Sequence, residues 1–157
     1  MSTFALICLV LSAIIYILYV SIVYIKYKPS CISESYYKIK YGYLFTIWTL
    51  LVSFLIFPSW VEISPINFQF LPFLSSISLG AVGLNPKYLE TDRKAHIIAA
   101  GLAVIISLIW NIVTGIYIIP ILLLVGVIIL LITKVSSLLF WVECAAFSNI
   151  YSAGSLV

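Results

Sequence analysis

The sequence predicts an all-α membrane protein, a bundle of six transmembrane helices that forms a single domain over residues 1–157. Charged residues make up 8% of the chain, against about 25% in a typical globular protein. Hydrophobic residues reach 64%, and several apolar runs have the roughly 20 residues that cross a bilayer. A water-soluble fold would lack the polar surface to cover such a core. We therefore expect the lipid bilayer as the main partner.

Polar breaks divide the apolar sequence into the six expected spans, at about residues 4–25, 43–60, 68–84, 96–114, 116–133 and 136–154. The first span is too long for the apolar core of a signal peptide. Pro58 is expected near the end of the second span, because proline interrupts helical hydrogen bonding. The apolar run from Ile97 to Thr133 is long enough for two crossings, with a turn expected near Thr114 and Gly115.

Small residues on the third expected span predict close contact with another helix. Ser76, Gly80 and Gly83 are spaced four and three apart, so they share one face of a helix. Such a seam lets a second backbone approach.

The segment 26–42 is the longest polar stretch of the chain. Ser33 is expected to cap a short interfacial turn, with Glu34 and Ser35 in its first positions. Tyr36 and Tyr37 suit the headgroup zone, where an aromatic ring is buried while its hydroxyl stays wet.

The fourth expected span carries a stripe of small and polar residues. The stripe consists of His96, Ala100, Ala103, Ser107, Asn111 and Thr114, spaced three or four apart. These residues fall on one helical face. Lipid offers them no hydrogen-bond partner, so the face should point into the bundle.

Glu143 is the acidic residue that lies well inside an apolar span. An ionised carboxylate at such depth is costly, so it should be neutral, hydrogen-bonded or cavity-facing. At about 1.5 Å per residue, Glu143 lies roughly 13 Å past Lys134 and Ser107 roughly 16 Å past His96. We therefore expect Glu143 to contact the polar stripe near Ser107, with Asn111 further out. A proton or ion site and a structural tether both remain open as its role.

His96 is the only histidine, and Asp92 precedes it by four residues. The two could form an acid–base pair or half of a metal site. An interfacial histidine paired with Asp92 is the favoured interpretation. Zinc hydrolases with seven helices use several histidines, so no metal and no cofactor are expected. The three cysteines are widely spaced and form no ligand motif.

The basic residues predict the topology. All eight lie in the first, third or fifth loop, as Lys26, Lys28, Lys38, Lys40, Lys87, Arg93, Lys94 and Lys134. The positive-inside rule makes those loops, at 26–42, 85–95 and 134–135, cytoplasmic. Both termini are then extracytoplasmic, in a bacterial-type inner membrane. A net charge of +3 is too small to indicate nucleic acid.

Three short stretches carry a resemblance: Ser33 to Tyr37, Leu44 to Trp48, and the loop that ends at Lys94-Ala-His96. They resemble small uncharacterised multi-pass membrane proteins of gut bacteria and their phages. The resemblance covers about residues 20 to 110. It implies a helical integral membrane protein and carries over no functional residues.

Three classes of function follow as hypotheses. The leading one is a small transporter or channel-like protein with Glu143 as its protonatable group. The second is a lipid-modifying membrane enzyme that acts at the cytoplasmic interface through Asp92 and His96. The third is a non-catalytic membrane accessory factor whose polar groups only hold helices together. A homo-oligomer is plausible for transport, because six short helices enclose little volume.

Overall fold

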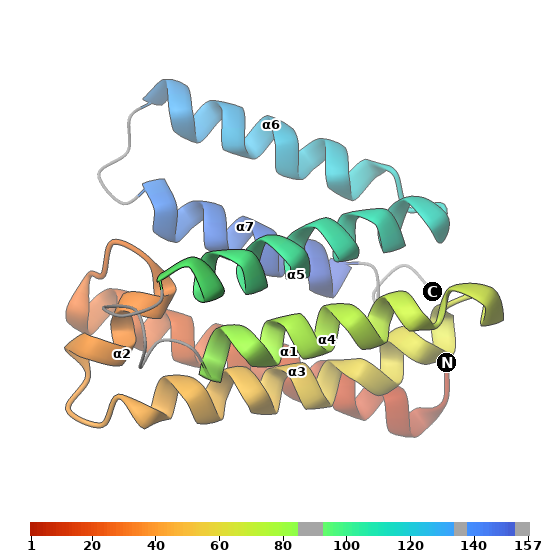
Figure 1. The fold of residues 1–157 in the computed structure, drawn as a ribbon, viewed down its shortest axis with the longest axis horizontal. Coiled ribbons are helices and arrows are strands. Elements are labelled where there is room, and N and C mark those ends of the chain that lie inside the picture. The colour runs from red at the N-terminus through yellow and green to blue at the C-terminus, as the bar shows by residue number, and fades with distance from the viewer. Residues whose placement is uncertain (85–92, 134–137, 153–157) are drawn as a thin grey trace.

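The computed structural model describes residues 1–84, 93–133 and 138–152, and within these ranges the chain is helical without strands. The helices pack side by side in one bundle (Figure 1). In chain order they are α1 (Thr3–Tyr27), η1 (Ile32–Glu34), α2 (Ser35–Lys38), α3 (Tyr43–Ile63), η2 (Ile66–Phe68), α4 (Phe70–Leu84), α5 (Arg93–Val113), α6 (Ile118–Thr133) and α7 (Leu138–Ser152). The all-α prediction is confirmed.

Four helical stretches are long and apolar enough to cross a membrane: Thr3–Tyr27, Tyr43–Ile63, Ile66–Leu84 and Lys94–Val113. They correspond to the first four expected spans. As described, α6 has 16 residues and α7 has 15, shorter than the roughly 20 that span the hydrocarbon core. Four of the six expected spans thus have the length and composition of a membrane crossing.

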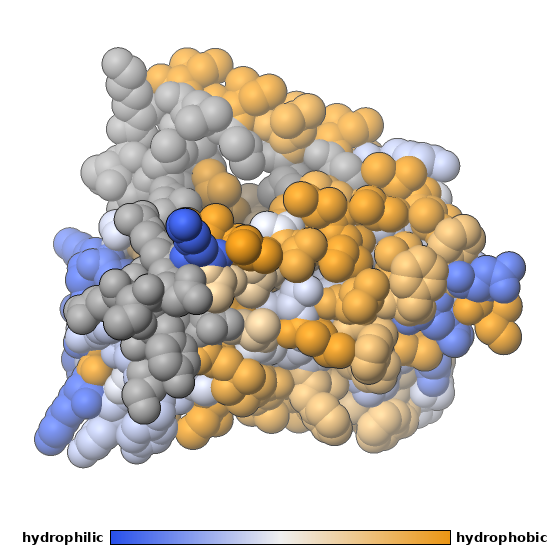
Figure 2. All heavy atoms as spheres, in the orientation of Figure 1, coloured by the Kyte–Doolittle hydropathy of each residue, from blue (hydrophilic) through white to orange (hydrophobic). Residues whose placement is uncertain are grey.

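The lysines that the structure describes gather at one end of the bundle. In Figure 1 the ends of α1 and α4 and the starts of α3, α5 and α7 all lie at the end that carries α2. Lys26, Lys28, Lys38, Lys40 and Lys94 belong to these helix ends. Figure 2 shows hydrophilic residues at this end and a second group at the opposite end, with a broad hydrophobic surface between them.

The contact between α3 and α4 uses the predicted small residues. A Cβ atom added to Gly83 would lie 2.7 Å from the Cβ of Thr49, so only glycine fits there. Thr46 donates a hydrogen bond to the Gly83 carbonyl at 2.8 Å, and Ser53 donates to the Ser76 carbonyl at 2.6 Å. The seam therefore combines close approach with hydrogen bonds between helices.

The end of α3 differs from the prediction. The helix continues through Pro58 to Ile63 instead of ending near residue 60. Contacts with other helices hold this last turn: Ser59 donates to the Ala5 carbonyl at 2.6 Å, and the Trp60 ring packs on Trp110. These interactions offset the hydrogen bond that proline cannot make.

The striped face of α5 points inward, as predicted. Ser107 and Asn111 are fully buried, and α5 packs chiefly against α4. Ser75 on α4 donates to the Ala103 carbonyl at 3.2 Å. The turn near Thr114 is also confirmed, because Gly115 has a φ of +82° that glycine adopts without strain.

Candidate functional site at the α2 end of the bundle

Glu143 holds the backbone of the segment that precedes α2. Its carboxylate accepts a hydrogen bond from the Ile32 amide at 2.5 Å and another from the Ser33 amide. These amides begin η1, and Cys31 at its N-cap supplies no side-chain hydrogen bond. Glu143, on α7, therefore caps the N-terminus of η1.

This arrangement corrects the prediction for Ser33. The expected cap is absent, and the Ser33 hydroxyl instead lies 3.4 Å from the Cys31 sulfur. The reason is that Ser33 is inside the 3-10 turn, where its own amide needs an acceptor. That acceptor is the carboxylate of Glu143.

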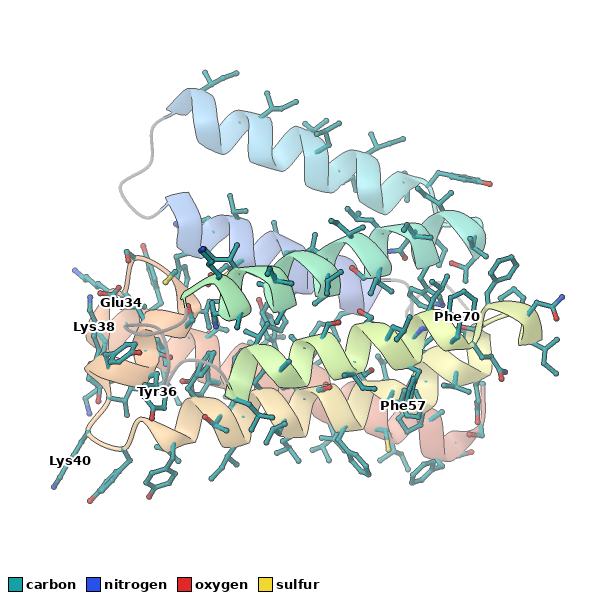
Figure 3. All side chains as sticks on the ribbon, viewed as in Figure 1. Glu34, Tyr36, Lys38, Lys40, Phe57 and Phe70 are labelled. Atoms are coloured by element: carbon teal, nitrogen blue, oxygen red, sulfur yellow. The ribbon has the colours of Figure 1, made fainter. Side chains whose placement is uncertain are left out.

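A second carboxylate, Glu34, holds the same segment on its exposed side. It accepts hydrogen bonds from the Ser30 amide at 2.5 Å and the Ser30 hydroxyl at 2.9 Å, and it pairs with Lys38 at 3.2 Å. Figure 3 shows Glu34 and Lys38 close together at this end of the molecule. Partial burial raises the pKa of Glu34, but the Ser30 hydrogen bonds and the Lys38 ammonium outweigh it and leave the pKa below its usual value.

His96 is buried in the first turn of α5, at 7% exposure. Its imidazole hydrogen-bonds the backbone of Val82, while its Nδ1 is buried without a hydrogen-bond partner among the residues that the structure describes. The bonded nitrogen is therefore Nε2, which must carry the proton to donate to a carbonyl. His96 was predicted at the interface beside Asp92, and Asp92 lies outside the described residues.

Glu143 and His96 line the same cavity, which has a volume of about 70 Å³. Ser33 is the third polar residue in its wall. The rest of the wall is apolar: Ile32, Phe45, Leu79, Val82, Ala100, Ala103, Val104, Ala146 and Phe147. At about 30 Å³ per water molecule, the cavity has room for about two.

Ser107 and Asn111 do not line this cavity. The Ser107 hydroxyl donates within its own helix, to the Val104 carbonyl at 2.8 Å. Glu143 was expected to pair with these residues because its depth in the membrane was counted from Lys134, and that of Ser107 was counted from His96. Counted from the helix starts, Glu143 is about 8 Å into α7 and His96 about 5 Å into α5, whereas Ser107 is about 21 Å in. The structure therefore brings Glu143 to the level of His96.

Aromatic residues and hydroxyl groups join α7 to α1 beyond the cavity. Tyr16 donates to the Cys144 carbonyl at 3.4 Å, and the Tyr151 hydroxyl lies 2.8 Å from the Ser12 hydroxyl. The Tyr16 ring stacks on Phe147, with centroids 5.1 Å apart. These contacts fix the position of α7, and with it the position of Glu143.

The donor set of the site does not suit a metal ion. Within residues 1–84, 93–133 and 138–152, no three side chains of His, Cys, Asp or Glu come together in a metal-binding group. The cavity instead offers hydrogen-bond acceptors, a carboxylate and an imidazole nitrogen, within an apolar wall.

No protein-family model, curated protein or solved structure matches this chain.

Proposed function

We propose that this chain is a small transporter or channel-like membrane protein in which Glu143 is the protonatable group. One observation carries the proposal: a carboxylate inside the helix bundle shares a cavity with the only histidine. Ionisable residues inside membrane helices are costly and commonly mark proton or ion pathways. The neighbouring imidazole of His96 lines the same cavity and has a ring nitrogen that can accept a proton.

We propose the following topology for this function. The chain crosses a bacterial-type inner membrane six times, with loops 26–42, 85–95 and 134–135 in the cytoplasm and both termini outside. The basic residues at the α2 end support this orientation through the positive-inside rule. Homo-oligomerisation also belongs to the proposal, because six short helices enclose little volume for a transport pathway.

A second candidate is a non-catalytic membrane factor in which Glu143 is only a tether. The hydrogen bonds from Ile32 and Ser33 favour it, since they give the carboxylate a structural role without any transport. The lipid-modifying enzyme gains no support from His96, because a buried imidazole bonded to Val82 is not presented to the interface.

Proton flux in liposomes tests the leading proposal. Purified protein is reconstituted with a pH-sensitive dye inside, and a pH gradient is imposed. We expect wild-type protein to dissipate the gradient and Glu143→Gln to lose at least about tenfold of that rate, because the amide cannot carry the proton. Glu62→Gln is the control, since it removes an exposed carboxylate from the end of α3 that lies away from the cavity.

Thermal unfolding in mild detergent separates transport from tethering. Glutamine keeps a carbonyl oxygen for the Ile32 amide, whereas Glu143→Leu leaves that amide unpaired at about 1–3 kcal/mol. We expect Glu143→Gln to melt near the wild type and Glu143→Leu clearly lower. Loss of flux in a stable Glu143→Gln variant supports transport. Absence of flux in the wild type, or full flux in Glu143→Gln, contradicts the proposal.

A further inference from the structure

We propose that the cavity between His96 and Glu143 binds ammonium or a small primary ammonium ion such as methylammonium. This inference rests on the proposed function, because it names the solute class for the same site. It starts from the Nδ1 atom of His96, a residue that lines the cavity; this buried atom has no hydrogen-bond partner within residues 1–84, 93–133 and 138–152. A buried polar atom without a partner is costly and calls for a ligand or an ordered water.

The hydrogen bond to Val82 decides what kind of partner the imidazole needs. Because Nε2 donates to the Val82 carbonyl, Nδ1 of the neutral ring holds a lone pair. Nδ1 is therefore an acceptor, and its partner must be a donor. A carbonyl or an anion does not meet this requirement.

Glu143 adds a second acceptor on the other side of the cavity. A carboxylate has about four lone-pair positions, and the Ile32 and Ser33 amides occupy two of them. The remaining positions favour a donor that carries positive charge, because charge-assisted hydrogen bonds are about twice as strong as neutral ones. An ammonium group has several N–H donors and the matching charge.

The size and the wall of the cavity restrict the ligand further. A volume of about 70 Å³ accommodates an ion with one or two heavy atoms. The alanine, valine and phenylalanine side chains of the wall suit a methyl group. Calcium and magnesium ions instead take six or more oxygen ligands, which one carboxylate, one imidazole nitrogen and one hydroxyl do not supply.

Nitrogen NMR of the single histidine provides a direct test. Selective ¹⁵N-labelling of histidine reports His96 alone, because the chain has no other histidine. The protein in detergent is titrated with methylammonium chloride and, separately, with tetramethylammonium chloride, which has no N–H donor. We expect the Nδ1 resonance to move saturably with methylammonium and to stay unchanged with tetramethylammonium.

A variant tests the role of the carboxylate in the same titration. We expect Glu143→Gln to weaken methylammonium binding by about tenfold, because the charge is lost while an acceptor oxygen remains. Glu62→Gln, at the end of α3 that lies away from the cavity, should leave the affinity unchanged. An Nδ1 resonance that ignores methylammonium, or that responds equally to both salts, overturns the inference.

The flux assay keeps the two proposals distinguishable. Proton flux without methylammonium binding would reject the ligand and retain the transporter. Saturable methylammonium binding without any flux of protons or methylammonium would retain the ligand site and reject the transporter.

Discussion

The α3–α4 pair and α6 are both strongly apolar, yet different interactions hold them in the bundle. Hydroxyl groups and glycines lie between α3 and α4, where Thr46 and Ser53 bond the facing backbone. By contrast, α6 packs mainly against α7, and the large side chains that the structure describes on it are exposed. Lipid tails are as apolar as leucine, so apolar contact alone adds little to helix association in a bilayer. We therefore expect the α3–α4 contact, with its close backbone approach and its hydrogen bonds, to contribute more to the free energy of unfolding than the contacts of α6.

Leucine truncations should show the largest contrast. Leu79 on α4 is 3% exposed and Leu124 on α6 is 62% exposed. We expect Leu79→Ala to lower the free energy of unfolding by about 3 kcal/mol, because it leaves a cavity in a packed core. Leu124→Ala should change it by less than about 0.5 kcal/mol. Denaturant unfolding in detergent measures both, and equal losses would break the comparison.

Glycine replacements should come next. At Gly83 an added methyl group meets Thr49, whereas at Gly126 on α6 nothing lies within 4 Å of the new Cβ. Overpacking costs about 1–3 kcal/mol, while alanine favours a helix over glycine by about 1 kcal/mol. We expect Gly83→Ala to lower the melting temperature and Gly126→Ala to leave it unchanged or raise it. A stabilising Gly83→Ala would show that α3 and α4 are not in close contact.

Removing one hydroxyl group should have the smallest effect. Ser53→Ala deletes a hydrogen bond between helices and should cost about 0.6 kcal/mol, the average for such bonds in a membrane. Ser78 donates to the Leu74 carbonyl of its own helix, so Ser78→Ala should be close to neutral. The difference between the two variants, measured by unfolding under identical conditions, isolates the contribution between helices. If both variants lose the same free energy of unfolding, the hydrogen bond between α3 and α4 contributes nothing beyond the loss of a serine hydroxyl.

Helix faces were predictable because residue spacing reports them. Spacings of three and four placed Ser76, Gly80 and Gly83 on one face of α4, and that face meets α3. The same rule placed Ser107 and Asn111 inside the bundle. A periodic pattern requires no knowledge of the neighbouring helix.

The partners across the bundle were not predictable in the same way. Spacing does not say which helix lies opposite, so Glu143 was expected beside Ser107 instead of the Ile32 amide and the His96 cavity. Nearly every residue has a backbone amide, so the sequence does not show which amide donates to Glu143. The sequence contained one indication of this contact, the Glu143 carboxylate itself. A carboxylate inside the bundle requires hydrogen-bond donors, and the side chains near it in the sequence offer few, so backbone amides were the remaining source.

The hydrogen bond between Ile32 and Glu143 also bears on how the chain is made. Its two residues are 111 positions apart, so ribosomes that add about 5–20 residues per second need roughly 5 to 20 s to synthesise the interval. During that time α1 and the segment after it have no α7 to dock on. The amides of Ile32 and Ser33 must then be satisfied by water or lipid headgroups. This end of the protein can therefore reach its final form only after the last helix has emerged, which makes its assembly a late event in biogenesis.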